Sequence, residues 1–311
     1  MSRKLQVLFV ILLVGGAIAV TLMQGGSENA KGVSNATSTK SNPNDGTISA
    51  SGQQPETRTL PKRKWDVLDP NVDAEAVAIQ SLDSGFPFLN YQTYKTWPMA
   101  SLTKLMTAVI VAEEMGLKKK VQVSQTAIDT EGLAGDFKSG EVYTSEDLLK
   151  ILLLTSSNDA ASAFEEAMGG RDAFVHLLNN KAEKLGMTQT VMHDASGLSD
   201  LNQSSASDLM KLARYLIEKH PDIVGWTRLQ SFIVQPANDT AVRSVYNINT
   251  LTAESRFLGG KTGTSPEARQ NLLAFLSFGN ERVAFIMLGS SDRAKETDRL
   301  IDWIRSAYIF N

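Results

Sequence analysis

The residues best suited to chemistry in this 311-residue chain are Ser101 and Lys104, which stand three positions apart. Pro98 precedes them, and apolar residues then recur at helical spacing, which predicts a helix from Ser101 to about Met115. Residues three apart share a helix face, so the hydroxyl and the amine can come within hydrogen-bond reach. A serine beside a lysine of lowered pKa is a nucleophile with its general base. Taken alone, the pair favours an ordinary surface helix, because both residue types are common.

Two later motifs change this interpretation. Ser156-Ser157-Asn158 stands between two expected helices, and Lys261-Thr262-Gly263 stands late in the chain. Each can be structural on its own, as a helix end with the next N-cap or as a turn or bulge. In order after Ser-x-x-Lys, they complete the motif set of penicillin-binding proteins and class A β-lactamases. Chance produces Lys-Thr-Gly in only roughly a few per cent of chains of this size.

At these motifs the chain resembles the serine D-Ala-D-Ala carboxypeptidases, the low-molecular-weight penicillin-binding proteins. The resemblance is carried by residues 98–108, 143–161 and 196–209, and it covers about residues 73–309. It implies a peptidase that removes the terminal D-Ala from peptidoglycan stem peptides through an acyl-enzyme. β-Lactams, which mimic that peptide end, would be its covalent inhibitors.

The resemblance assigns four catalytic residues. Ser101 attacks the carbonyl between two terminal D-Ala residues, and Lys104 accepts its proton. Burial and the nearby charge of Lys261 would both lower the pKa of Lys104. Ser156 relays the proton to the departing D-Ala amine, and Asn158 holds Lys104 and a substrate amide. Water then hydrolyses the acyl-enzyme.

The resemblance also assigns residues that bind the substrate. In Lys261-Thr262-Gly263, the lysine and the threonine direct a positive charge and a hydroxyl toward the terminal carboxylate. The backbone N–H groups of Ser101 and Thr264 form the oxyanion hole. Arg293 corresponds to an arginine that reaches the substrate carboxylate in relatives. Its alternative interpretation is a solvated charge at a helix start.

The chain departs from the family at one motif. Many relatives carry His-Gly-Leu where this chain has Ser196-Gly197-Leu198, so any role of that histidine in groove shape or deacylation is not carried over. His193 is close in sequence but not at the matching position. The three histidines of the chain lack metal-ligand spacing, and we expect neither a metal nor another cofactor.

Composition narrows the function classes. The net charge is −3 with no basic stripe, which gives no support for nucleic-acid binding. The chain has no cysteine, which excludes disulfides, thiolate metal sites and a cysteine nucleophile. The hydrophobic fraction of 42% and charged fraction of 21% are ordinary for a globular enzyme.

The first 64 residues predict a location and a tether. Residues 1–23 combine Arg3 and Lys4 with an apolar run long enough to cross a bilayer. We expect an uncleaved N-terminal anchor that places the chain at the extracytoplasmic face of a bacterial membrane. A signal peptide cleaved at Ala17-Ile18-Ala19 is the alternative. Residues 24–64 are rich in Ser, Asn and Gly, and they predict a flexible tether.

The catalytic domain is expected at residues 65–311. Strand patterns occupy both of its ends, at 75–94 and 231–288, and helical patterns occupy about 125–225. This order favours an α+β fold of the serine β-lactamase and DD-peptidase type. One antiparallel sheet flanked by helices would be built from both ends of the domain, with an all-helical subdomain alongside and the site between them.

Three alternatives to a carboxypeptidase remain open. An endopeptidase that cuts D-Ala cross-links would use the same residues in a groove of different shape. A β-lactam or muropeptide sensor would acylate without turnover. A class A β-lactamase would need a further glutamate to activate water, and no such loop motif is found between Asn158 and Lys261.

Overall fold

The computed structural model describes residues 60–132 and 135–310 of the chain. The expected anchor at 1–23, and the expected tether up to residue 59, lie outside the described residues. The last residues of that tether are folded, because β1 (Lys62–Arg63) pairs with β13 (Tyr308–Ile309). The expected boundary at residue 65 is therefore too late by a few residues. In the described part of the chain, no helix is both long and apolar enough to span a membrane.

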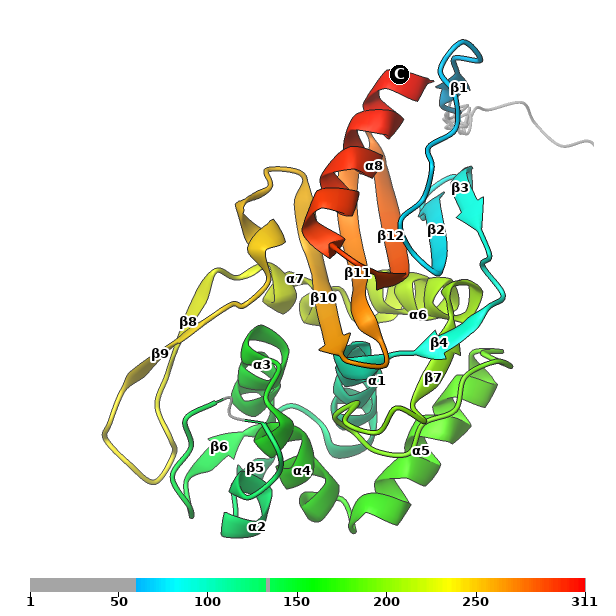
Figure 1. Ribbon diagram of the computed structural model, residues 1–311. Coiled ribbons are helices and arrows are strands. Elements are labelled where there is room, and N and C mark those ends of the chain that lie inside the picture. Colours follow the sequence, from blue (N-terminus) through cyan, green and yellow to red (C-terminus); the bar gives the residue numbers. More distant parts are fainter. Residues whose placement is uncertain (1–59, 133–134, 311) are drawn as a thin grey trace, which may run out of the picture. The chain divides into compact units, whose positions relative to one another are not determined.

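One five-stranded sheet joins the two ends of the domain, as expected. Its order is β10-β11-β12-β2-β3, and every neighbouring pair is antiparallel (Figure 1). The strands are β2 (Ala76–Ser81), β3 (Pro87–Tyr91), β10 (Phe257–Ser265), β11 (Arg269–Phe278) and β12 (Glu281–Ser290). The early pair β2 and β3 continues the sheet that the three late strands begin.

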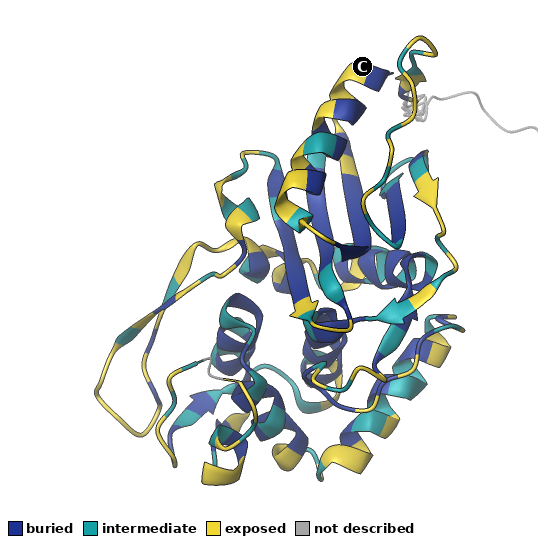
Figure 2. Cartoon of the chain, viewed as in Figure 1, coloured by how far each residue is buried: buried dark blue, intermediate teal, exposed yellow. Residues whose placement is uncertain are grey.

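Both faces of this sheet are covered. Side chains alternate along a strand, and β2 sends Val77 and Ile79 to one apolar cluster and Ala76 and Ala78 to another. The first cluster includes the closing helix α8 (Arg293–Ala307). The second includes α1 (Thr103–Ile110) and α6 (Ala206–Lys219). The central strands are accordingly dark blue along most of their length in Figure 2.

Helices dominate the middle of the chain, as the sequence predicts. They are α2 (Gln125–Ile128), α3 (Ser145–Thr155), α4 (Asn158–Ala167), α5 (Arg171–Lys184), α6 and α7 (Pro221–Arg228). α6 ends at Lys219, and Pro221 begins α7, since proline fits the first position of a helix. The region also holds a small sheet of β5 (Lys120–Gln122) and β6 (Val142–Thr144).

Short elements connect the two parts of the fold. The strand β4 (Thr96–Pro98) pairs with β7 (Gln203–Ser205), and both lie next to the segments that form the site. A hairpin of β8 and β9 packs against α3 through buried Val234 and Val245. The remaining bounds are β8 (Ser231–Val234), β9 (Arg243–Tyr246) and the short helical turns η1 (Ala100–Leu102), η2 (Val111–Met115) and η3 (Thr250–Ala253).

One buried carboxylate on α4 predicts a pH-dependent stability. Asp159 is 5% exposed, its Oδ1 has no hydrogen-bond partner, and burial raises its pKa from 3.8 to about 6. Because ionisation is penalised only in the folded protein, the free energy of unfolding falls as pH rises from 3.8 toward 6. Asp159→Asn has no carboxyl that can ionise, so it removes this pH dependence of the free energy of unfolding.

The Asn variant should therefore gain stability relative to the unmodified protein as pH rises. The difference in free energy of unfolding between the two proteins should increase by about 2 kcal/mol from pH 4.5 to 7.5. Urea denaturation at both pH values measures it. A difference that does not change with pH would contradict the assignment.

Candidate active site

Ser101 lies in a strained turn directly before α1. It is the middle residue of η1, and the residue before it, Ala100, has a φ of 46°. A left-handed conformation costs a residue with a Cβ roughly 1–2 kcal/mol, so the surroundings must impose it. The Met99 N–H donates to the Asn202 carbonyl at 2.7 Å, and the Thr103 hydroxyl donates to the Ala100 carbonyl at 2.8 Å. These bonds fix the turn that presents the Ser101 hydroxyl.

Lys104 meets Ser101, as the three-residue spacing predicts. Its side chain is fully buried, and Nζ lies 3.0 Å from the Ser101 Oγ. The amine donates to the Asn158 Oδ1 at 2.7 Å and to the Ser196 carbonyl at 2.6 Å. A neutral amine has two N–H donors and one lone pair. With both donors engaged by acceptors, the lone pair remains for the proton of the Ser101 hydroxyl.

Burial sets the protonation of Lys104. It lowers the pKa of this amine to about 7, and the negative charge of Asp194 acts in the opposite direction. The expectation that burial lowers this pKa is confirmed. The neighbouring amine of Lys261 also has a pKa well below its usual value. Burial is again the main cause there, followed by the charges of Lys104 and Arg293.

The Ser156-Ser157-Asn158 motif is a break between two helices that turns two side chains into the site. Ser156 ends α3 with a φ of 61°, and the Ser157 hydroxyl caps α4 by accepting from the Ala160 N–H at 3.1 Å. The structural interpretation of this motif, a helix end followed by the next N-cap, is therefore confirmed. Asn158 reaches Lys104 through Oδ1 and donates through Nδ2 to the Glu131 carbonyl at 2.8 Å.

Lys261 brings β10, an end strand of the sheet, into the site. Its side chain is 2% exposed, and Nζ donates to the Ser156 hydroxyl at 3.0 Å and to the Thr262 carbonyl at 2.9 Å. Thr262 is buried beside it. Ser156 thus contacts Lys261, and the two motifs meet through one hydrogen bond.

Gly263 lets β10 approach the nucleophile. A Cβ at this position would lie 2.8 Å from the Met99 carbonyl oxygen and 3.2 Å from the Ser101 nitrogen. The missing side chain therefore allows the strand to run beside the Ser101 backbone, with Thr264 next in the chain. The structure brings together the two segments whose N–H groups were expected to form the oxyanion hole.

Arg293 is tied to the same strand. Its Nη1 donates to the Gly263 carbonyl at 3.0 Å, the Thr264 hydroxyl at 3.1 Å and the Asn271 carbonyl at 3.2 Å. Burial lowers the pKa of this guanidinium, although it starts α8 at the edge of the site. The guanidinium at this helix start is therefore held by hydrogen bonds to β10 and β11.

Three contributors to the site were not predicted as such. The Ser196 backbone carbonyl accepts from the Lys104 amine, and the Asp194 carboxylate accepts from the Ser196 N–H. Fully buried Asn202 accepts from the His193 N–H at 2.7 Å and donates to the Thr103 hydroxyl at 3.1 Å. A run of Asp, Ser, Gly and Asn signals a loop, but no spacing rule reveals that the loop would fold against Lys104.

A family model described as D-alanyl-D-alanine carboxypeptidase, Peptidase_S11, matches residues 64–292. The chain belongs to this family. The match covers all nine candidate residues except Arg293, which lies one position beyond it.

Curated relatives share the family's names. The chain is 35% identical over 182 residues to a D-alanyl-D-alanine endopeptidase of Haemophilus influenzae, covering 57% of this chain and 61% of the relative. It is 27% identical to the D-alanyl-D-alanine carboxypeptidase DacF of Bacillus subtilis, covering 76% and 63%. The chain thus spans less than two thirds of the length of these relatives.

Solved structures show the same fold. A D-alanyl-D-alanine carboxypeptidase from Mycobacterium tuberculosis matches with a TM-score of 0.72 and 26% identity, covering 80% of this chain and 99% of that one. The Streptomyces K15 DD-transpeptidase matches with a TM-score of 0.71 and 22% identity, covering 77% and 100%. The expected DD-peptidase type of fold is confirmed.

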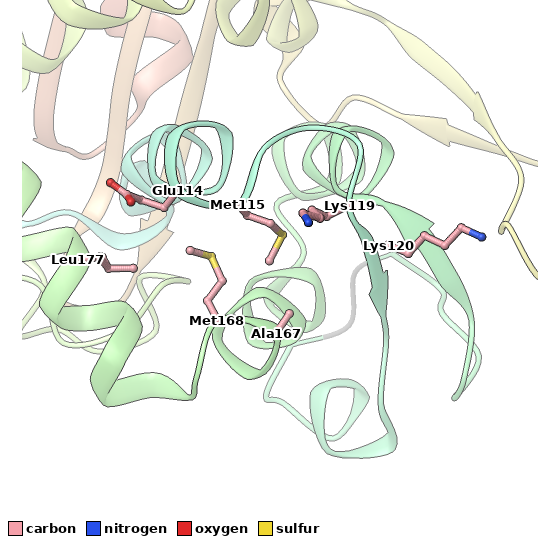
Figure 3. A pocket seen from close by; sticks show the side chains of 7 residues that line it. All are labelled: Glu114, Met115, Lys119, Lys120, Ala167, Met168 and Leu177. Carbon is pink, nitrogen blue, oxygen red and sulfur yellow. The ribbon is translucent and has the colours of Figure 1, made fainter.

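A pocket elsewhere on the domain shares no residue with this family site. It has a volume of about 480 Å³ and is lined by Glu114, Met115, Lys119, Lys120, Ala167, Met168 and Leu177 (Figure 3). These residues come from the end of the nucleophile helix, from β5 and from the α4–α5 region. The chemistry of the family motifs therefore lies apart from this pocket.

The protonation of Lys104 predicts how Ser101 acylation depends on pH. Only the neutral amine can accept the Ser101 proton, and its pKa is about 7. The rate of acylation by a fluorescent penicillin should therefore rise with pH through 7 and level off about one unit above it. Lys104→Arg, which cannot deprotonate, should lower that rate by about 10²–10⁴-fold. Unfolding temperatures of both proteins provide the control for folding, and wild-type acylation by the Arg variant would exclude Lys104 as the base.

Proposed function

We propose that the chain is a serine D-Ala-D-Ala carboxypeptidase that removes the terminal D-Ala from peptidoglycan stem peptides. The observation that carries the proposal is a fully buried lysine amine, with a pKa lowered to about 7, at 3.0 Å from the Ser101 hydroxyl. A nucleophile paired with such a base is the arrangement that acyl transfer requires. Membership of the family and the names of its curated relatives support the choice of D-Ala-D-Ala as substrate.

In the acylation step, the Ser101 Oγ bonds to the carbonyl carbon of the last peptide bond. The hydroxyl proton passes to the Lys104 Nζ, and negative charge develops on the carbonyl oxygen. The N–H groups of Ser101 and Thr264 stabilise this oxygen. When the C–N bond breaks, the proton held by Lys104 passes through the Ser156 hydroxyl to the D-Ala amine, which leaves, and Lys104 is neutral again. Water then attacks the ester carbon and gives a proton to Lys104, and Lys104 returns a proton to the Ser101 oxygen as the ester C–O bond breaks.

The terminal carboxylate of the substrate binds at β10. Lys261, Thr262 and Arg293 supply two cationic groups and a hydroxyl on adjoining segments. Burial lowers the pKa of Lys261 and so weakens its hold on a proton. A bound carboxylate favours the protonated amine and raises that pKa. Recognition of the anionic end is thereby coupled to the protonation of Lys261.

The proposed location is the extracytoplasmic face of the bacterial cell membrane. The apolar segment at residues 1–23 would serve as the anchor, or as a cleaved signal peptide, and residues 24–59 would form the tether. This arrangement would let the domain reach peptidoglycan beyond the membrane, with β-lactams as covalent inhibitors of the same site.

The proposed activity predicts covalent labelling that depends on Ser101. A fluorescent penicillin should label the protein, and Ser101→Ala should lose that label while keeping its unfolding temperature. The wild type should also release D-Ala from a diacetyl-Lys-D-Ala-D-Ala peptide, measured as free D-Ala. Equal labelling of the Ala variant would overturn the assignment of the nucleophile. Stable labelling without D-Ala release would favour a sensor instead.

A D-Ala cross-link endopeptidase is the second candidate function. The observation that favours it is the 35% identity to the endopeptidase of Haemophilus influenzae. Both reactions use the same acyl-enzyme on Ser101. Isolated cross-linked muropeptides and a free pentapeptide, digested in parallel by equal enzyme, separate the two. A carboxypeptidase should act faster on the pentapeptide, and faster cleavage of the cross-link would replace the first proposal with the second.

A further inference from the structure

A buried carboxylate organises the loop that faces Lys104. Asp194 is 4% exposed, and its Oδ1 accepts from the Ser196 N–H at 2.8 Å, the Ser196 hydroxyl at 2.9 Å and the Gly197 N–H at 2.5 Å. Its Oδ2 accepts from the Ser199 N–H at 2.7 Å. One side chain thus satisfies four donors of residues 196–199.

The same loop is anchored to the catalytic helices on both sides. The Ala195 N–H donates to the Glu165 Oε1 of α4 at 2.8 Å, and the Ala195 carbonyl accepts from the Thr107 hydroxyl of α1 at 2.6 Å. Gly197 packs so closely on the nucleophile turn that a Cβ there would lie 1.9 Å from the Ala100 carbonyl oxygen. The position of the loop is therefore fixed relative to both Ser101 and Lys104.

The Ser196 carbonyl is the part of this loop that touches the base. It accepts one of the two hydrogen bonds that leave the lone pair of Lys104 for Ser101. The carboxylate of Asp194 accepts from the Gly197 N–H, which shares a peptide plane with the Ser196 carbonyl, so it determines where that carbonyl points. Asn202 ties the carbonyl of Asp194 to the nucleophile helix, through its bonds to Asp194 and Thr103.

We propose that Asp194 is a positioning residue for the general base: its carboxylate aims the Ser196 carbonyl at Lys104, and its negative charge acts on that buried amine. The inference rests on the proposed function, since it concerns the base of the acylation step. Asp194 itself takes no part in bond formation. Its effect reaches the reaction only through the orientation and protonation of Lys104.

The charged groups around Lys104 allow the effect of Asp194 on its pKa to be separated from other effects. Lys261 of β10 and Arg293 are basic groups, and Asp159 and Glu165 of α4 are acidic. Glu165 is engaged by Arg171 at 3.2 Å, and burial favours the neutral form of Asp159. Asp194 is the acidic group whose charge acts on Lys104 and raises its pKa, against the effect of burial.

Asp194→Asn removes the charge and keeps an oxygen that can accept from the Ser196 and Gly197 N–H groups. The pKa of Lys104 should then fall. The acidic limb of the pH–rate profile, where the acylation rate rises with pH, should therefore move to lower pH by on the order of one unit. A merely structural role would lower the rate at every pH without moving that limb. The measurement is the rate constant of Ser101 labelling by a fluorescent penicillin between pH 5 and 9.

A matched control is available in Asp208, a buried carboxylate that braces the chain upstream of the same loop. It accepts from the Gln189 N–H at 2.7 Å and the Thr190 hydroxyl at 3.0 Å, and within the described part of the chain none of its hydrogen bonds reaches residues 194–202. Asp208→Asn should leave the acidic limb at its wild-type pH. A shift of the same size in this control would overturn the proposal.

A second pair of variants keeps the test valid if a substitution at Asp194 reduces folding. Asp194→Glu and Asp194→Gln disturb the loop alike but differ in charge. Misfolded molecules do not label, so they do not enter the measured rate constant. The labelling rate of the Gln variant should rise at a lower pH than that of the Glu variant. The role of Asp194 would be overturned if both variants rose at the same pH, or if the Asn variant rose at the wild-type pH. A wild-type protein that fails to label at Ser101 would instead overturn the proposed function.

Discussion

The site depends on removing one lysine amine from water. A buried ammonium loses its hydration, so burial favours the neutral form and lowers the pKa of Lys104 to about 7. Three oxygen atoms surround the amine at 2.6 to 3.0 Å, and each comes from a different segment of the chain. The enzyme therefore needs no histidine to obtain a base that is available near neutral pH. It needs a fold that shields this amine from solvent and holds its two hydrogen-bond acceptors in place.

The sheet and the helices supply that enclosure from opposite sides. β10 can run beside the nucleophile turn because Gly263 has no side chain, and Asn271 of β11 donates to the Met99 carbonyl at 3.1 Å. The break between α3 and α4 closes another side with Asn158. Antiparallel pairing of β4 with β7 brings the start of the nucleophile turn next to the end of the 194–202 loop. Each contact joins residues that are distant in the sequence.

The sequence predicts what local spacing can encode. Ser101 and Lys104 meet because residues three apart share a helix face, and the strands were found because their side chains alternate between two buried faces. The meeting of Lys261 with Ser156 required a resemblance, because no periodicity relates β10 to the end of α3. β1 was missed because two residues form a strand only when a distant partner, here β13, is present.

Ser196, where many relatives carry histidine, shows why part of the site cannot be predicted from residue types. The Ser196 hydroxyl donates to Asp194 and accepts from the Leu198 N–H at 3.1 Å, so the side chain is used within the loop. The contact with Lys104 comes from the backbone carbonyl, which every residue possesses. The side chain at this position can therefore change while the acceptor for the base remains. What must be kept is the conformation of the loop, and its bonds to Asp194 and Asn202 are where the sequence encodes that conformation.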